Sequence, residues 1–316
     1  MNICTKTLIP YIHQNPNHQS AKIRKIVIQG DRSENGGGNL ELSEVIDVDA
    51  LRNYVLSRRA QDGGFAFCYP LPSSLPETYY AVYILDVLGE KIEDREKLVN
   101  YLRSSLKMNP HSVYFVLKTL DILGEELPDV SDFAIERLRK AMGRAVATKD
   151  VHELESGITA TYSFDMPNVL REVYSLVTVL RLLNVECEEM SRAKKFVEMF
   201  RKDGGFGVKD PTLEDTYYAI SVLRRRDEKA LGFIMEREWK DGGFSKVPGS
   251  YPPYIEDTYF AVESLHVMGV KYKNYRTVRY LASLQNADGG FRRSVFLGTS
   301  SLEFSYYAVA SLVRMR

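Results

Sequence analysis

A tight glycine turn that leads into a tyrosine-rich apolar segment occurs four times in this chain of 316 residues. The copies begin at Asp62, Asp203, Asp241 and Asp288, and each reads Asp-Gly-Gly-Phe. Each copy is followed by a short loop, an acidic residue and a run headed by aromatic residues, such as EDTYYAISVL after the second turn. One Asp-Gly pair is common in turns. The repetition with the same sequel therefore indicates a repeat architecture.

Two predicted helices make up each repeat. The first is amphipathic, and the second is apolar on nearly every side, which is typical of a helix that is buried all round or faces a cavity. We predict amphipathic helices over 48–59, 94–106, 131–142, 188–200, 227–238 and 274–285, and apolar helices over 78–88, 111–123, 171–183, 215–223, 257–268 and 304–313. The second and third pairs lack the glycine turn. Six pairs predict an all-α fold, an (α/α)6 barrel whose outer ring is amphipathic and whose inner ring is apolar.

The first part of the chain does not share the repeat. We expect residues 1–47 to form an N-terminal extension that packs on the barrel, and residues 48–316 to form the repeat domain. A short helix is predicted over 5–13 and a strand over 22–29. The segment 143–168 is expected to be the longest loop between repeats, and long loops in compact domains are often functional.

Composition excludes several classes of partner. The 42 basic and 42 acidic residues give a formal net charge of zero, which argues against binding nucleic acid or an anionic membrane through bulk charge. No apolar run approaches the roughly 20 residues of a transmembrane helix, and the N-terminal apolar stretch is too short for a signal peptide. The three cysteines are far apart and form no CxxC motif, so we expect reduced thiols and a cytoplasmic location.

The heads of the apolar helices are the predicted location of a site. If these helices run in the same direction, their N-termini surround one mouth of the barrel, and unpaired N–H groups there suit a phosphate. Tyrosines would line the cavity behind the mouth. Such a cavity suits a long hydrocarbon that carries a diphosphate. Two alternatives stay open, since the acidic residues Glu77, Glu172, Asp215, Asp257 and Glu303 can serve as helix caps, and the tyrosines can fill the barrel as core.

The turn followed by (Glu/Asp)-Thr-Tyr-Tyr-Ala resembles the repeat of the protein prenyltransferase β-subunits and of the squalene and terpene cyclases. The resemblance covers about residues 48 to 316 and implies the (α/α)6 barrel. It is less specific for activity, because this barrel hosts prenyl transfer, cyclisation and plain binding. In the prenyltransferases the β-subunit works with a helical α-subunit, so the resemblance also implies a helical partner protein.

The resemblance implies that the usual zinc site is lost. Protein prenyltransferases hold a zinc ion with an Asp, a Cys and a His, and these positions fall on Asp215, Tyr217 and Phe304. Two of the three ligands are therefore replaced by residues that bind zinc poorly. We expect no zinc and no zinc-dependent prenylation, and the sequence gives no support for Mg²⁺.

The diphosphate-binding positions of the family are partly kept. They fall on Lys209 and Tyr218, on Arg171 in place of a histidine, and on Thr212 in place of a second lysine. The resemblance implies a weakened polyanion site formed by Arg171 and Lys209, unless both are solvated surface charges. We expect the apolar part of the ligand to contact further tyrosines, namely Tyr217, Tyr259 and Tyr80.

Cyclase chemistry has less support in the sequence. The acidic motifs DxDD and DDxxD are absent, as is the Cys-Gly-Glu-Gln motif of thioester-bearing relatives. A single buried carboxylic acid could still protonate a substrate, and Asp215 and Asp257 are the candidates for that catalytic role. Three hypotheses follow: a prenyltransferase-like protein that binds a lipid diphosphate, a terpenoid cyclase-like enzyme, and a non-catalytic scaffold for a partner chain.

Overall fold

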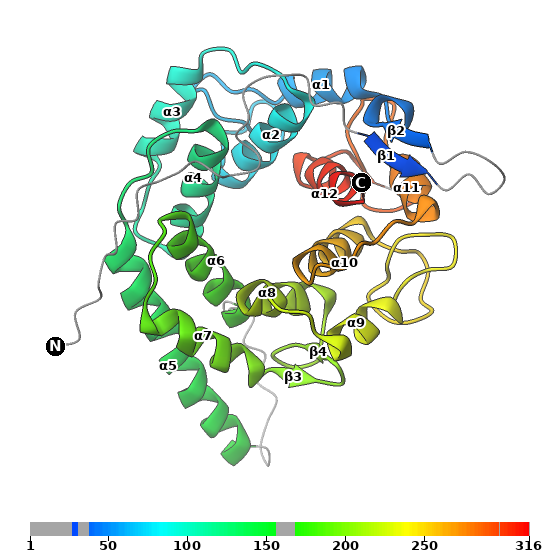
Figure 1. Ribbon diagram of the computed structural model, residues 1–316. Coiled ribbons are helices and arrows are strands. Elements are labelled where there is room, and N and C mark those ends of the chain that lie inside the picture. Colours follow the sequence, from blue (N-terminus) through cyan, green and yellow to red (C-terminus); the bar gives the residue numbers. More distant parts are fainter. Residues whose placement is uncertain (1–26, 31–37, 156–167, 297, 316) are drawn as a thin grey trace.

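The computed structural model describes residues 27–30, 38–155, 168–296 and 298–315, and its helices form two concentric rings (Figure 1). The outer helices are α1 (Val48–Leu56), α3 (Arg95–Ser104), α5 (Ser131–Glu155), α7 (Glu188–Glu198), α9 (Glu228–Met235) and α11 (Tyr275–Ala282). The inner helices are α2 (Leu75–Leu88), α4 (Pro110–Leu123), α6 (Val169–Leu182), α8 (Leu213–Leu223), α10 (Ile255–Val267) and α12 (Leu302–Arg314). Each inner helix contacts the next, and α12 packs back on α2, so the inner ring is closed. The predicted (α/α)6 barrel of six outer–inner pairs is confirmed.

Local capping explains where the inner helices begin. The side chains of Ser74, Asn109, Thr212 and Ser301 each accept a hydrogen bond from the backbone N–H three residues later. Such a bond satisfies one of the N–H groups that a helix start leaves without an intrahelical partner. The helices therefore begin a few residues before the tyrosines, slightly earlier than the apolar pattern predicts.

The glycine turns connect outer and inner helices of the first, fourth, fifth and sixth pairs. Their phenylalanines, Phe65, Phe206, Phe244 and Phe291, are fully buried. The backbone N–H of each donates to a hydroxyl at the head of the following inner helix, from Thr78, Thr216, Thr258 and Ser305 respectively, at 3.0–3.1 Å. The hydroxyl residue that precedes the first tyrosine of each motif is therefore structural, because it satisfies a buried backbone donor.

Close backbone packing explains the glycines and closes the barrel. A Cβ on Gly289, whose φ is +88°, would lie 2.1 Å from the carbonyl oxygen of Ala50 in α1. The turns of the first, fourth and fifth pairs approach the outer helix of the next pair in the same way. The Gln285 side chain adds two bonds across the closure, accepting from the N–H of Asp47 at 2.8 Å and donating to its carbonyl oxygen at 2.9 Å.

The long loop predicted over 143–168 is partly wrong. Helix α5 continues through this segment to Glu155, and residues 156–167 lie outside the described part of the chain. Alanine, lysine and glutamate are strong helix formers, and the stretch RAVATKDVHELE carries several of them. This stretch has few large apolar residues, so hydrophobic periodicity predicted only the first part of the helix.

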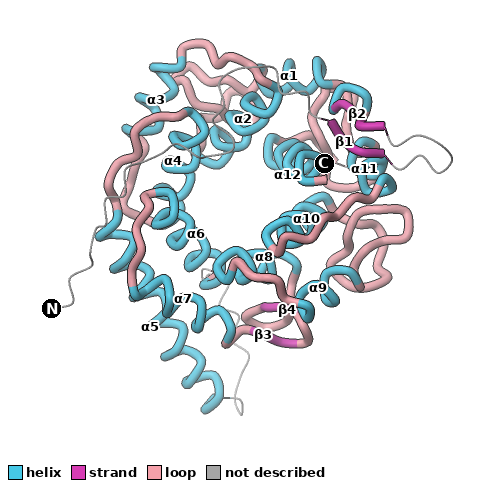
Figure 2. Tube along the Cα trace, viewed as in Figure 1, coloured by secondary structure: helices cyan, strands magenta, loops and turns pink. Residues whose placement is uncertain are grey.

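The described residues outside the rings are few. Strand β1 (Val27–Gly30) pairs antiparallel with β2 (Gly38–Glu41) in the register Val27↔Glu41, and β3 (Arg201–Lys202) pairs with β4 (Gly205–Phe206). All four strands lie outside the inner ring (Figure 2). The 3-10 helix Leu42–Glu44 follows β2, and Leu42 and Ile46 are buried in the core. The predicted helix over 5–13 and the start of the predicted strand lie outside the described residues.

Candidate functional site

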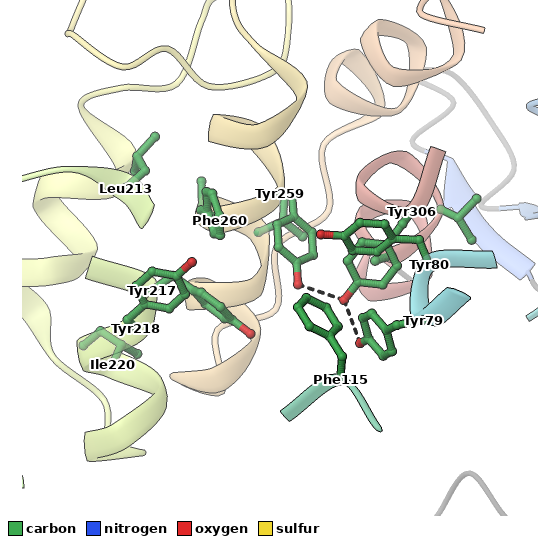
Figure 3. Close-up of a cluster of buried hydrophobic side chains, with 14 of the residues drawn as sticks. Tyr79, Tyr80, Phe115, Leu213, Tyr217, Tyr218, Ile220, Tyr259, Phe260 and Tyr306 are labelled. Atoms are coloured by element: carbon green, nitrogen blue, oxygen red, sulfur yellow. Dashed lines mark hydrogen bonds between the residues drawn. The ribbon is translucent and has the colours of Figure 1, made fainter. Parts of the chain in front are cut away.

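One tyrosine from each inner helix points toward the barrel axis. These six ring tyrosines stand at equivalent positions: Tyr79, Tyr114, Tyr174, Tyr217, Tyr259 and Tyr306. Their hydroxyl groups form two chains of three. In one chain Tyr306 lies between Tyr79 (3.1 Å) and Tyr259 (3.0 Å), as Figure 3 shows. In the other Tyr174 lies between Tyr114 (3.2 Å) and Tyr217 (2.9 Å).

A second aromatic layer follows the ring tyrosines by one residue. It consists of Tyr80, Phe115, Tyr218, Phe260 and Tyr307, whereas α6 carries Ser175 at this position. Two of these phenols reach back one helical turn, since Tyr218 donates to Glu214 at 2.7 Å and Tyr307 donates to Glu303 at 3.0 Å. The side chains of this layer are large everywhere except on α6.

A cavity of about 370 Å³ lies between the ring tyrosines and the heads of the inner helices. Every ring tyrosine and every member of the second layer lines it, including Ser175. The heads of α4 and α6 also line it, through Asn109, His111, Asn168 and Arg171. The cavity therefore opens over the two helix pairs that lack the glycine turn.

Arg171 carries the net positive charge of the cavity wall. The other basic group of the wall, Arg137, donates to the Glu172 carboxylate at 2.7 Å, so these two charges offset each other. Within the described part of the chain, the Arg171 guanidinium makes no hydrogen bond or ion pair. Burial alone would lower the pKa of Arg171, but the neighbouring Tyr218 and Glu214 raise it above its ordinary value. Arg171 is therefore a permanent cation beside the cavity.

His111 is a poor second cation. Its ring packs against Phe115, with centroids 4.9 Å apart, and it lines the cavity near the head of α4. Burial, and then the positive charge of Arg171, lower the pKa of His111 below its ordinary value. The histidine is consequently neutral at pH 7 and offers a hydrogen bond rather than a charge.

The two predicted catalytic acids lie outside the cavity lining, although Asp215 contacts the lining residue Asn168. Asp215 is buried, and its carboxylate accepts a hydrogen bond from Asn168 Nδ2 at 2.5 Å. Burial raises the pKa of Asp215, and the Asn168 bond opposes that shift. Burial and the charge of Glu256 raise the pKa of Asp257 to about 7. Neither residue is among those that line the cavity.

The predicted binding residues divide into two groups. Arg171, Tyr80, Tyr217, Tyr218 and Tyr259 all line the same cavity. Lys209 is exposed in the loop before α8 and does not line it. Its backbone carbonyl oxygen accepts a bond from Lys202 Nζ at 3.3 Å.

Ser175 is a cavity residue that sequence reasoning missed. A serine on a helix carries no obvious chemistry, and its hydroxyl donates to the carbonyl oxygen of Arg171 at 2.9 Å. The signal was present, however, in an alignment of the six inner helices. Position by position, only α6 replaces an aromatic residue with a small one directly after the ring tyrosine.

The three positions that the resemblance assigns to zinc ligands carry side chains with other partners or with no donor atom. The Asp215 carboxylate is bonded to Asn168, the Tyr217 hydroxyl is bonded to Tyr174, and Phe304 has no donor atom. Among the described residues no group of three or more His, Cys, Asp or Glu side chains could hold a metal ion. A search of the same residues finds no helix long and apolar enough to cross a membrane.

Comparison with known proteins gives the family. The model of the prenyltransferase alpha-alpha toroid domain matches residues 38–113, 103–224 and 212–315, and the chain belongs to this family. Among solved structures the chain is similar to Candida albicans protein geranylgeranyltransferase-I complexed with GGPP. The identity is 15%, the match covers 84% of this chain and 77% of that one, and the TM-score is 0.38. No curated protein matches.

Proposed function

We propose that this chain binds an isoprenoid, or a similar lipid, that carries a diphosphate group. The hydrocarbon occupies the aromatic cavity, and the diphosphate lies at its mouth against Arg171. A volume of about 370 Å³ is at the lower end of the range for small-molecule sites, roughly 300–1,000 Å³. A mainly apolar wall with few polar groups is also typical of such sites.

The observation that carries this proposal is the pair Arg171 and Ser175. On α8 the corresponding pair is Glu214 and Tyr218, and on α12 it is Glu303 and Tyr307. On both helices the tyrosine hydroxyl donates to the glutamate carboxylate. The phenol ring fills the space beside the helix, and the carboxylate charge has a hydrogen-bond partner within the same helix. On α6 the serine leaves room, and the arginine guanidinium makes no hydrogen bond or ion pair with the described residues. Together they supply what a lipid diphosphate needs, an apolar space and a positive group at its edge.

We also propose that the chain works without the zinc-dependent chemistry of protein prenyltransferases. The side chains of Asp215 and Tyr217 are engaged with Asn168 and Tyr174, which supports this view. Cyclisation has weaker support than binding, because an acid that protonates a substrate must touch it, and neither Asp215 nor Asp257 lines the cavity.

A protein partner is a second candidate, favoured by one surface observation. Tyr251 and Phe296 are 54% and 61% exposed, and their rings touch edge to face with centroids 5.3 Å apart. Exposed aromatic residues are enriched at protein interfaces. A purified chain that stays monomeric and recovers no partner from native lysate would contradict the scaffold function.

Isothermal titration of the chain with farnesyl and geranylgeranyl diphosphate tests the proposed function. We expect micromolar binding that Arg171→Gln weakens about tenfold, since a charge-assisted contact is lost. The matched control is Arg192→Gln on α7, where the arginine is exposed and pairs with Glu188. No heat of binding with either lipid, or equal affinity in the Arg171→Gln variant, would contradict the proposal.

A further inference from the structure

The ring tyrosines form the inner end of the cavity. Within the described part of the chain, no residue lines the cavity from further along an inner helix than the residue after each ring tyrosine. The next side chains inward lie behind the ring. Tyr83 packs against Tyr306 with centroids 4.8 Å apart, and Lys118 Nζ lies 5.6 Å from the centre of the Tyr79 ring. A ligand that fills the cavity therefore ends against tyrosine side chains.

The six ring tyrosines form the floor of the cavity, and within the described part of the chain not all of their hydroxyl groups donate a hydrogen bond. A phenol has one O–H donor, and three phenols linked by two hydrogen bonds always leave one donor unused, whichever way the protons point. Tyr79–Tyr306–Tyr259 is one such chain and Tyr114–Tyr174–Tyr217 is the other. These tyrosines make no other hydrogen bond with the residues that the structure describes. Two O–H donors therefore have no acceptor among the side chains and backbone groups that the structure describes.

The two tyrosine O–H donors determine which chemical group at the end of a ligand fits against the ring tyrosines. A buried donor without an acceptor is costly, and an ordinary isoprenoid ends in methyl groups that accept nothing. A hydroxyl or carbonyl oxygen at that end would accept one of these bonds. A carboxylate suits the floor less well, because Arg171, the net cation of the wall, is assigned to the diphosphate, and Lys118, behind the Tyr79 ring, does not line the cavity. Burying a second negative charge without a partner is unfavourable.

We infer that the lipid ends in a neutral oxygen, a hydroxyl or carbonyl group, at the end opposite its diphosphate. This inference rests on the proposed function and narrows its substrate class. A site built to hydrogen-bond a polar group discriminates strongly against the analogue that lacks it, because the polar groups of the site are then left unpaired.

Matched ligand pairs test the inference. Geranyl and farnesyl diphosphate are each compared with the same molecule hydroxylated on its terminal methyl group, by isothermal titration with the full chain. For the chain length that fits, we expect the hydroxylated ligand to bind about tenfold more tightly, through one additional buried hydrogen bond.

Two triple variants assign the preference to the ring. One is Tyr79→Phe/Tyr259→Phe/Tyr306→Phe, and the other is Tyr114→Phe/Tyr174→Phe/Tyr217→Phe. Each removes one complete hydroxyl chain and keeps the aromatic packing, a replacement that is often nearly neutral for stability. We expect at least one variant to bind plain and hydroxylated ligands equally. Circular dichroism melts establish that the variants are folded, and the wild-type comparison stands without them.

The outcomes separate this inference from the proposed function. If wild-type protein binds the plain ligand as tightly as the hydroxylated one, the inference is wrong and the proposed function stands. If the preference persists in both triple variants, the ring tyrosines are not its source and the inference is wrong. If no ligand of either kind binds, the proposed function fails and the inference falls with it.

Discussion

The inner helices of the third and fourth pairs differ at two equivalent positions that lie one helical turn apart. On α8, Glu214 and Tyr218 bond to each other and the phenol fills the second aromatic layer. On α6, Arg171 and Ser175 occupy the same two positions, and the Arg171 guanidinium makes no hydrogen bond or ion pair with the described residues. The fourth pair also carries a glycine turn that docks on the next outer helix, and the third pair does not. The regular repeats therefore build the barrel, whereas the degenerate third repeat supplies the candidate site.

The largest expected effect concerns the turns. Gly289→Ala places a methyl group 2.1 Å from the Ala50 carbonyl oxygen at a φ of +88°, so backbone must move where the ring closes. We expect the free energy of unfolding to fall by about 3 kcal/mol or more. Urea denaturation followed by circular dichroism measures it. The control is Gly89→Ala, with a φ of +71° and no atom within 4 Å of the added methyl, which should cost only about 1 kcal/mol. Equal losses in the two variants would contradict a closing role for the turn.

Replacing Arg171 and Ser175 on α6 with the residues that α8 carries at these positions should abolish ligand binding while the chain still folds. Arg171→Glu/Ser175→Tyr fills the cavity and reverses the charge at its mouth. We expect lipid diphosphate binding to weaken about a hundredfold or more, since an attractive contact becomes repulsive. Titration calorimetry measures the affinity, and Ser175→Ala, which keeps the space, is the matched control. Undiminished binding in the double variant would show that the difference between the two helices has no functional meaning.

The reverse exchange sharpens the comparison. Glu214→Arg/Tyr218→Ser gives α8 the pattern of α6, adding a second cation and more room beside Arg171. We expect diphosphate affinity to rise about fivefold through a further charge-assisted contact, measured by the same titration. The loss of a packed aromatic ring also lowers stability, so a thermal melt accompanies it. Affinity that stays the same or falls in a folded variant would count against Arg171 as the anion-binding group.

The smallest expected effect is a pH dependence of stability in the first pair. Burial, and then the charge of Glu303, raise the pKa of Glu77 to about 7 from an ordinary 4.5, while Arg58 opposes the shift. Between these values the folded chain holds a proton that the unfolded chain has released, so stability falls as pH rises. Glu77→Gln should therefore gain about 1 kcal/mol relative to wild type on going from pH 5 to pH 8.

Urea titrations at both pH values measure this gain. Glu172→Gln in the third pair is the control, because Arg137 there loses its partner at 2.7 Å. That variant is expected to be less stable than wild type at either pH. The explanation for Glu77 fails if its variant differs from wild type by the same amount at pH 5 and pH 8.

The sequence predicted the barrel because its signals are local and repeated. Each glycine turn, each buried phenylalanine and each Thr-Tyr pair performs the same task in several copies, so any one copy confirms the others. Arg171 and the cavity tyrosines were predicted from the positions of the helix heads and from the resemblance. Helix α5 was cut short in the prediction because the sequence of its second half has too few large apolar residues to show a clear periodicity.

Other parts of the site needed the structure. Asp215 stands two residues before a ring tyrosine, and on a helix residues so spaced point in different directions. Its carboxylate consequently bonds to Asn168 at the head of α6 and is not part of the cavity lining. Aligning the inner helices marks Ser175 as the small residue of its layer, but only the packed neighbours show that the space beside it is part of a cavity. The hydroxyl chains of the ring depend on contacts between residues up to 227 positions apart.

A crystal structure of the chain with a bound lipid diphosphate tests the central claim most directly. We expect lipid density between α4 and α6, with the diphosphate against the Arg171 guanidinium and the chain passing Ser175 to end at the ring tyrosines. A ligand bound anywhere else, or a cavity that stays empty at saturating lipid while α6 keeps its present conformation, would contradict it.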